Sequence, residues 1–370
     1  VGSEMCIRDR VDLRNARSGP WDQQRLPLDT LQANVVRQDT QWQLDGLQAT
    51  LGRAQLGGEG RYQPAQGSLA AQWQGQLQAR ALDPSRLWST LAPAALDLTA
   101  SARQTAQHPD RITLQATAKG TGDAPSAAGL RLRELRLQGH WRGEGRVLQI
   151  DEGLLDALQT RLNLQGTLDL RAGRFAGGGS VQLPGAQGQA DGSFAAADGN
   201  GDVDLRIDNT ATVLDWLRSL HSLPVIGPRL REAMARQPLL NEGRLNGQAS
   251  LKAQWRGGLG SLGWPANGPV APLQAQLTLE VPRLSASLPG SSSTDWTVSD
   301  LRLQASGSPA DMAVQLGAQA AQGPWSAALQ TQGRAQALWP LPAIGAAPAR
   351  VQIESLTPVS YTHLTLPTSD

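Results

Sequence analysis

The sequence has few of the residues on which disulfide-stabilised proteins and compact enzymes depend. It has one cysteine, Cys6, so an internal disulfide framework is excluded. Aromatic residues make up only 4% of the chain, and 11 of them are Trp, which leaves few Phe and Tyr to fill a large core. Positive and negative side chains nearly balance, at a net charge of +1, so the charge gives no reason to expect nucleic acid as a partner.

Long hydrophobic runs are also missing. No stretch reaches the roughly 18 apolar residues of a membrane-spanning helix, and no signal peptide is recognisable. Residues 1–10 and 358–370 break with the style of the rest and are similar to translated sequencing-adapter sequence. We therefore leave both ends out of the fold prediction and expect the natural protein to continue beyond them.

Alternating apolar and polar residues fill most of the remaining chain. Between residues 135 and 170, Leu, Gly and Trp stand at every second position of two segments, with Arg, Gln, His, Asn, Thr and Asp between them. A period of two gives a β-strand one apolar and one polar face. The pattern recurs between Gly-rich turn sequences, and it predicts an all-β fold: an elongated, mostly antiparallel open β-groove of repeated strands with a few short helical insertions.

Two of the repeated segments share a defined irregularity. Residues 42–49 and 296–303 share one pattern: Trp at the first position, an apolar residue at the third, Leu at the sixth and an apolar residue at the eighth. The two-residue step before the Leu reverses the alternation, which predicts a β-bulge in each segment.

Helical spacing interrupts the strands twice. Asp83 as a cap and Pro84 in the first turn predict a short helix near residues 83–91. Apolar residues on both sides of a Pro-containing break predict a helix–break–helix insertion over residues 209–238. The expected organisation is therefore two β-groove segments, 11–208 and 239–357, separated by this insertion.

Residues with catalytic or metal-binding chemistry are sparse. His108, His140 and His221 are scattered and lack paired carboxylates or cysteines at a useful spacing. No nucleotide-binding or serine-hydrolase motif is present either. We therefore expect no enzyme activity, no metal and no cofactor.

Residues 198–204 resemble the start of a calcium-binding loop. However, Val203 stands where such a loop needs Gly, and its twelfth position is Asn209 rather than Glu. The preferred interpretation is a hairpin turn that leads into a strand.

The apolar face mixes Leu with Gly and Ala. Two packed sheets need bulky side chains from both inner faces to fill a layer about 10 Å thick, so this composition favours an open groove over a closed sandwich core, which is the alternative. A groove for an acyl chain needs no specific polar contacts, because each buried CH₂ gains about 0.8 kcal/mol. The residues predicted to line it are Leu135, Leu137, Leu148, Ile150, Leu162, Leu164, Leu168, Leu170, Val203, Leu205, Ile207, Leu277, Leu279, Leu301 and Leu303.

Three of these segments resemble a known family. The runs LRLQG at 135–139, VLQID at 147–151 and RLNLQGTLDL at 161–170 are similar to the strands of the AsmA-like envelope proteins, and within that family to the TamB (translocation and assembly module subunit) group. Short helical links such as residues 82–87 alternate with strands in that family. The resemblance covers residues 11–357, although residues 156–158 are Asp-Ala-Leu where the family often has Gly-Gly.

The resemblance implies a β-taco, which is a sheet folded over into a hydrophobic trough. It also implies a non-enzymatic bridge across the periplasm that carries phospholipids between the inner and outer membranes and supports outer-membrane biogenesis. An inner-membrane anchor outside this chain and an Omp85-class outer-membrane barrel are the implied partners, with no nucleic acid among them.

Other functions are possible for an alternating β chain. A scaffold could assemble outer-membrane proteins through exposed strand edges. A transmembrane β-barrel is disfavoured because the chain lacks aromatic girdles. A passive adhesin or β-helix is a further alternative.

Overall fold

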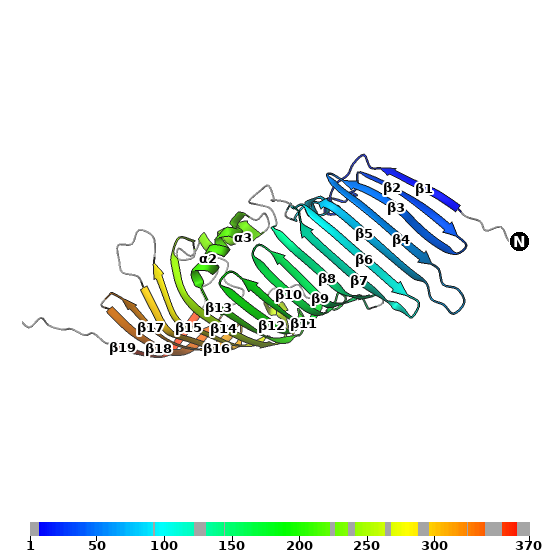
Figure 1. Cartoon of the computed structure of the whole chain (residues 1–370). Coiled ribbons are helices and arrows are strands. Elements are labelled where there is room, and N and C mark those ends of the chain that lie inside the picture. The colour runs from blue at the N-terminus through cyan, green and yellow to red at the C-terminus, as the bar shows by residue number, and fades with distance from the viewer. Residues whose placement is uncertain are drawn as a thin grey trace, which may run out of the picture. The chain divides into compact units, whose positions relative to one another are not determined.

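The computed structural model describes residues 7–91, 93–121, 131–143, 145–222, 226–235, 241–262, 268–287, 296–323, 325–336 and 350–360. The chain divides into two compact units, which are described separately (Figure 1). The first comprises Val1–Ala172 with Leu220–Leu230, and the second comprises Gly173–Ser219 with Arg231–Asp370. The boundary at Ala172 falls inside the first predicted groove segment.

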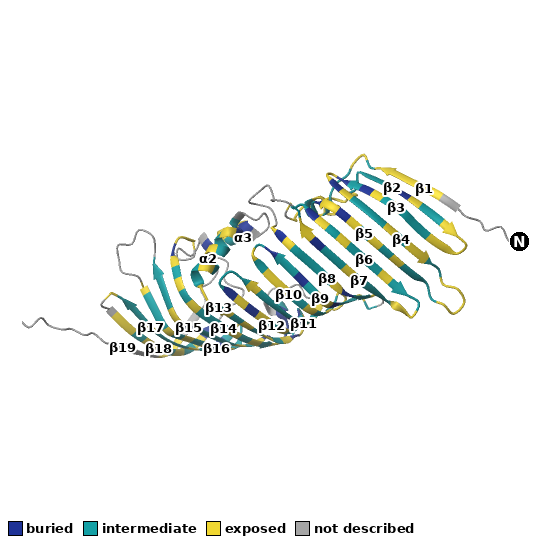
Figure 2. Cartoon of the chain, in the orientation of Figure 1, coloured by how far each residue is buried: buried dark blue, intermediate teal, exposed yellow. Residues whose placement is uncertain are grey.

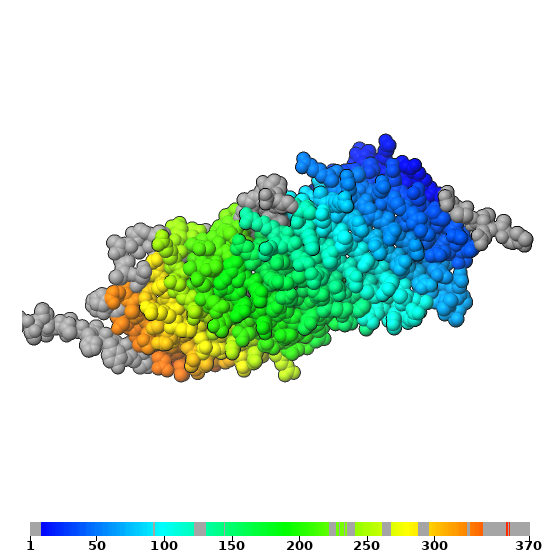
Figure 3. All heavy atoms as spheres, viewed as in Figure 1, coloured from blue at the N-terminus to red at the C-terminus, as the bar shows by residue number. Residues whose placement is uncertain are grey.

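Consecutive antiparallel strands form the sheet of the first unit. Each strand pairs with the next one along the chain, so the colours of Figure 3 follow each other in chain order from blue through cyan to green in this unit. The strands are β1 (Ile7–Arg14), β2 (Thr30–Gln38), β3 (Gln41–Leu51), β4 (Ala54–Gln63), β5 (Gln72–Leu82), β6 (Leu96–Thr105), β7 (His108–Gly120), β8 (Leu132–Arg142), β9 (Val147–Ala157) and β10 (Thr160–Asp169).

The second unit repeats this arrangement. Its strands also pair in sequence and antiparallel. They are β11 (Arg174–Leu183), β12 (Ala186–Ala195), β13 (Asn200–Ile207), β14 (Arg244–Arg256), β15 (Gln274–Ser287), β16 (Trp296–Ser308), β17 (Asp311–Gln322), β18 (Trp325–Gln336) and β19 (Arg350–Ser360). The prediction of an all-β, antiparallel open groove with few short helices is confirmed.

Both predicted bulges are present. The register between β3 and β4 shifts between Leu44 and Leu47, and Gly46 there has a φ of 59°. The register between β16 and β17 shifts between Ser299 and Arg302, where Asp300 has a φ of 52°. One residue in the left-handed region therefore reverses the alternation in each case, as a bulge requires.

The helices are short. They are η1 (Trp21–Gln23), α1 (Pro84–Leu87), α2 (Thr210–Ser219), η2 (Leu220–Ser222), α3 (Ile226–Ala235) and η3 (Leu259–Leu262). The side chain of Asp83 caps α1 by accepting a hydrogen bond from the Ser85 amide at 3.0 Å. Of the predicted insertion at 209–238, residues 223–225 and 236–238 lie outside the described residues. No helix in the described part of the chain is long and apolar enough to cross a membrane.

The sheet also includes residues that the sequence analysis left out of the fold. β1 begins at Ile7 and pairs with β2 from Ile7 to Arg14. β19 continues to Ser360, so residues 358–360 pair with β18 as well. The break in sequence style at residues 7–10 and 358–360 therefore does not interrupt strand pairing.

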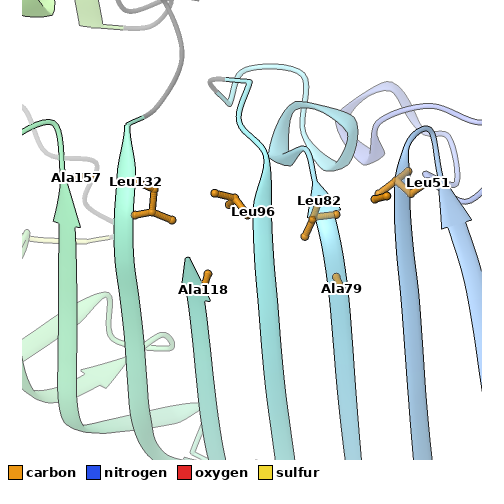
Figure 4. Packing of buried hydrophobic residues seen from close by; sticks show 8 residues of the cluster. Leu51, Ala79, Leu82, Leu96, Ala118, Leu132 and Ala157 are labelled. Carbon is orange, nitrogen blue, oxygen red and sulfur yellow. The ribbon is translucent and has the colours of Figure 1, made fainter. Parts of the chain in front are cut away.

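The buried core of the first unit lies at one end of its strands. Leu51 and Leu82 end their strands, whereas Ala54 and Leu96 begin theirs, so antiparallel pairing brings all four to the same end. Figure 4 shows Leu51, Leu82 and Leu96 side by side with Leu132 and Ala157, and Figure 2 shows most buried positions of this unit near that end. We call this end the closed end. Its buried cluster consists of Leu51, Ala54, Ala79, Leu82, Leu96, Ala118, Leu132 and Ala157.

Candidate hydrophobic groove

The strand register of the first unit aligns its apolar residues in rows that run across the sheet. The first row, next to the closed end, contains Leu31, Ala49, Leu56, Ala79, Leu98, Ala118, Leu135, Leu155 and Leu162. The second row contains Leu47, Gly58, Leu77, Ala100, Ala116, Leu137, Gly153 and Leu164, each paired with the next. One face of the sheet is therefore apolar over its whole width.

Two further rows continue this face away from the closed end. The third row is rich in small residues: Leu44, Gly60, Gly75, Ala102, Leu114, Gly139, Ile150 and Gly166. The fourth contains Trp42, Tyr62, Trp73, Gln104, Ile112, Trp141, Leu148 and Leu168, and we call it the aromatic row.

Exposure rises along the strands from the closed end to the aromatic row. In β3, Leu51 and Ala49 are 4% and 6% exposed, whereas Trp42 is 41% exposed. In β5, Leu82 and Ala79 are buried, but Leu77 is only half-buried. A closed sandwich would bury all these positions alike, so the gradient indicates that the face is covered at one end only.

A groove of about 710 Å³ lies on this face over β2 to β8. Its apolar lining comes from the second to fourth rows and from Val35, and includes Leu44, Leu77, Leu114 and Leu137. A Cβ built on Gly60 or Gly75 would make only ordinary van der Waals contact, 3.5 or 3.6 Å from a backbone oxygen, so a side chain could be accommodated at either position. The volume is within the ~300–1,000 Å³ typical of ligand sites.

Polar and charged residues occupy the opposite face. Arg136 binds Glu134 at 2.7 Å and Glu152 at 3.1 Å, so it bridges β8 and β9. The hydrogen bond from Arg136 lowers the pKa of Glu134, and Glu134 in turn raises the pKa of Arg136. A second hollow, of about 440 Å³, is lined on this face by Gln43, Arg61, Gln74, Gln76 and Arg103 among others. These charged side chains therefore lie on the face opposite the groove.

The predicted lining residues of the first unit lie in these rows, with one exception. Leu135 and Leu162 are in the first row, Leu137 and Leu164 in the second, Ile150 in the third, and Leu148 and Leu168 in the aromatic row. Leu137 is the one that lines the 710 Å³ groove. Leu170 lies beyond the end of β10, is 55% exposed, and donates its backbone N–H to the Arg146 carbonyl at 3.0 Å.

The predicted residues of the second unit also share one face. Leu205, Leu279 and Leu303 belong to one row, joined through Leu251 of β14. Val203 and Leu277 belong to the next row, joined through Ala253. Ile207 pairs with Ala249, and Leu301 pairs with Val281 on the same face. Helix α2 contacts β14.

The sequence analysis missed most of the residues that line the groove. Leu44, Leu47, Leu77 and Leu114 follow the same alternation as the predicted residues. Leu77 and Leu114 stand on strand faces that the alternation predicts, but the Gly and Ala residues beside them on those faces weaken the apolar signal. The alternation shows which face of each strand is apolar. The groove also depends on how neighbouring strands align, and the alternation does not give that alignment.

The residues considered for chemistry form no cluster in the structure. His140 lies 3.0 Å from Asp151, its neighbour across β8 and β9. No group of three or more His, Cys, Asp or Glu side chains in the described residues could hold a metal ion. Residues 196–199 form the turn between β12 and β13, and Val203 is in β13, so the prediction of a hairpin is confirmed.

Comparison of the chain with models of protein families, with curated proteins and with solved structures found no match.

Proposed function

We propose that the apolar face binds phospholipid acyl chains and that the chain is part of a non-enzymatic lipid bridge in a cell envelope. The observation that supports this proposal is a groove of about 710 Å³, lined by apolar side chains that are only half-buried. Among the described elements of the first unit, strands contact their neighbours in sequence, and no second layer covers the groove. An exposed apolar surface of this extent marks a site of interaction.

An acyl chain suits this groove better than a compact ligand does. The face offers Leu, Ala and Gly over many strands, and the described residues contain no cluster of His, Cys, Asp or Glu that could hold a metal ion. Burial of a hydrocarbon chain needs area rather than directed contacts, at about 0.8 kcal/mol for each CH₂. The resemblance to AsmA-like proteins supports the same function, and with it a periplasmic location, an inner-membrane anchor outside this chain and an Omp85-class partner.

A photocrosslinking amino acid at Leu137 tests the proposal. Leu137 lines the groove from β8, and its neighbour Gln138 is exposed on the opposite face. We expect the probe at Leu137 to capture co-purifying phospholipid, detected by mass spectrometry of the intact adduct. The matched probe at Gln138 should capture none. Equal capture at both positions, or no lipid at Leu137, would contradict a lipid-binding groove.

The alternative function, a scaffold that adds strands of outer-membrane proteins at a sheet edge, has less support. Each strand from β2 to β9 pairs with a neighbour on both sides, so none of these strands offers a free edge to another chain. The apolar face is exposed along these same strands, so the groove is the better candidate for the functional surface.

A further inference from the structure

All aromatic residues in the described strands of the first unit lie in one row. Trp42, Tyr62 and Trp73 are direct partners across β3, β4 and β5, and Trp141 follows in β8 through Gln104 and Ile112. Trp42 and Tyr62 are 41% and 43% exposed. A core would bury these rings, so their common position at the open side of the groove calls for another explanation.

The two ends of the apolar face differ in chemistry. At the closed end, Leu87 and Ala94, from α1 and the segment after it, pack against the buried cluster. At the other end stand the aromatic side chains, which combine an apolar ring with an N–H or O–H donor. Trp and Tyr with this character gather where the hydrocarbon of a bilayer meets its head groups. The face therefore changes from hydrocarbon-like to interface-like along each strand.

The distance between these ends corresponds to one acyl chain. In β5, Trp73 is six residues from Ala79 of the buried cluster, a span of roughly 20 Å at ~3.3 Å per residue. The hydrocarbon core of a bilayer is about 30 Å thick, so the chains of one leaflet reach about 15 Å. A lipid with its chains along the strands would thus place its glycerol region close to the aromatic row.

A positive charge stands at the same end. The Arg37 guanidinium lies over the Trp42 ring, 5.4 Å from its centroid, and donates through Nε to the Asp39 carbonyl at 3.1 Å. In the part of the chain that the structure describes, no carboxylate forms an ion pair with Arg37. An exposed guanidinium beside the aromatic row complements the phosphate of a phospholipid.

We propose that the aromatic row marks the head-group level of the groove. The lipid lies with its chain ends toward the closed end and its glycerol and phosphate between the aromatic row and Arg37. This orientation rests on the proposed lipid-binding function and adds to it the side of the groove from which the head group protrudes. Trp42, Tyr62, Trp73 and Trp141 are then positioning residues for the polar part of the lipid.

Two photoreactive phosphatidylcholines test this orientation on the full chain. One carries a diazirine near the ester carbonyl of an acyl chain, and the other carries it at the chain terminus. After irradiation, labelled residues are located by peptide fragmentation in β5. We expect the ester-side probe to label Trp73 several-fold more than Ala79 and the terminal probe to label Ala79 several-fold more than Trp73. The same profile for both probes, or a reversed one, would overturn the proposed orientation while leaving lipid binding intact. An absence of label from both probes would overturn lipid binding as well.

Single substitutions test whether the row acts through its aromatic rings or only through its apolar surface area. Trp42→Leu keeps an apolar side chain in the row but removes the interfacial ring, so the labelling preference of the ester-side probe in β3 should fall several-fold. Trp88→Leu is the matched control, because Trp88 is 49% exposed and lies outside the strands. A profile that Trp42→Leu leaves unchanged would overturn the role of the row, and an equal loss in Trp88→Leu would do the same.

Discussion

Replacing Leu77 and Leu82 in turn by Ala distinguishes an open face from a covered core within one strand. Both residues are in β5, but Leu82 is 6% exposed in the buried cluster, whereas Leu77 is half-buried beside the groove. Leu→Ala removes apolar surface worth about 2 kcal/mol when the side chain is fully buried. At Leu82 the cavity left behind adds to this loss, so we expect a decrease of about 3 kcal/mol in the free energy of unfolding.

The loss at Leu77 should be much smaller. Leu77 is only partly buried, and its removal enlarges an open groove instead of creating a closed cavity. Only part of the transfer term is lost and no cavity term is added, so we expect a loss of less than about 2 kcal/mol. The assay is urea unfolding of the delipidated full chain followed by circular dichroism, with midpoints compared at unchanged slope. An equal loss of about 3 kcal/mol at both positions would mean that the face is covered, and the open groove would then be wrong.

Two further predictions concern the turns of the first unit. Leu158 and Gln159 connect β9 to β10 with φ values of 54° and 62°, a conformation that non-Gly residues adopt at a cost. Gln159→Gly should therefore stabilise the chain by about 1 kcal/mol in the same assay. Gln78→Gly, in the middle of β5, should destabilise it. The pKa of Asp29 is lowered from 3.8, first by its hydrogen bond with Ser18, then by the Gly52 amide at 2.6 Å and by the positive charge of Arg86. Its contribution to stability is complete above pH 3.8 and is lost as the pH falls through its lowered pKa. The difference in unfolding free energy between wild type and Asp29→Asn should therefore shrink in acid. A difference that persists unchanged far below pH 3.8 would contradict this assignment. Asp110→Asn, at an exposed position, is the control.

The fold was predictable because its signals are local. Alternation with a period of two identifies a strand within a few residues, and the reversed alternation after Leu44 and Val298 locates both bulges without knowledge of the neighbours. Cross-strand pairing then follows from short turns, such as Gly52-Arg53 between β3 and β4. A meander needs no long-range choice of partner, so local signals were sufficient for the fold class.

The candidate groove was only partly predictable, because burial is not a property of the alternation. Leu77 and Leu82 both look like core residues in sequence, yet α1 and the segment after it cover only the end of the face near Leu82. Leu170 has the same parity as Leu168, but its strand ends at Asp169 and leaves it exposed. Strand ends and covering segments depend on contacts between residues far apart in sequence, and a periodic pattern contains no information about them.

The aromatic row shows what additional signal the sequence did contain. Trp42 and Trp73 are the second residues of β3 and β5, whereas Tyr62 and Trp141 are the second-to-last residues of β4 and β8. Neighbouring strands of a meander run in opposite directions, so a residue that begins one strand lies beside a residue that ends the next. Aromatic residues that alternate between strand starts and strand ends must therefore gather at one end of the sheet. Folding alone does not require this alternation, because the exposed rings of Trp42 and Tyr62 add little to a core. It is expected if one end of the groove contacts the polar part of a lipid and the other contacts its hydrocarbon.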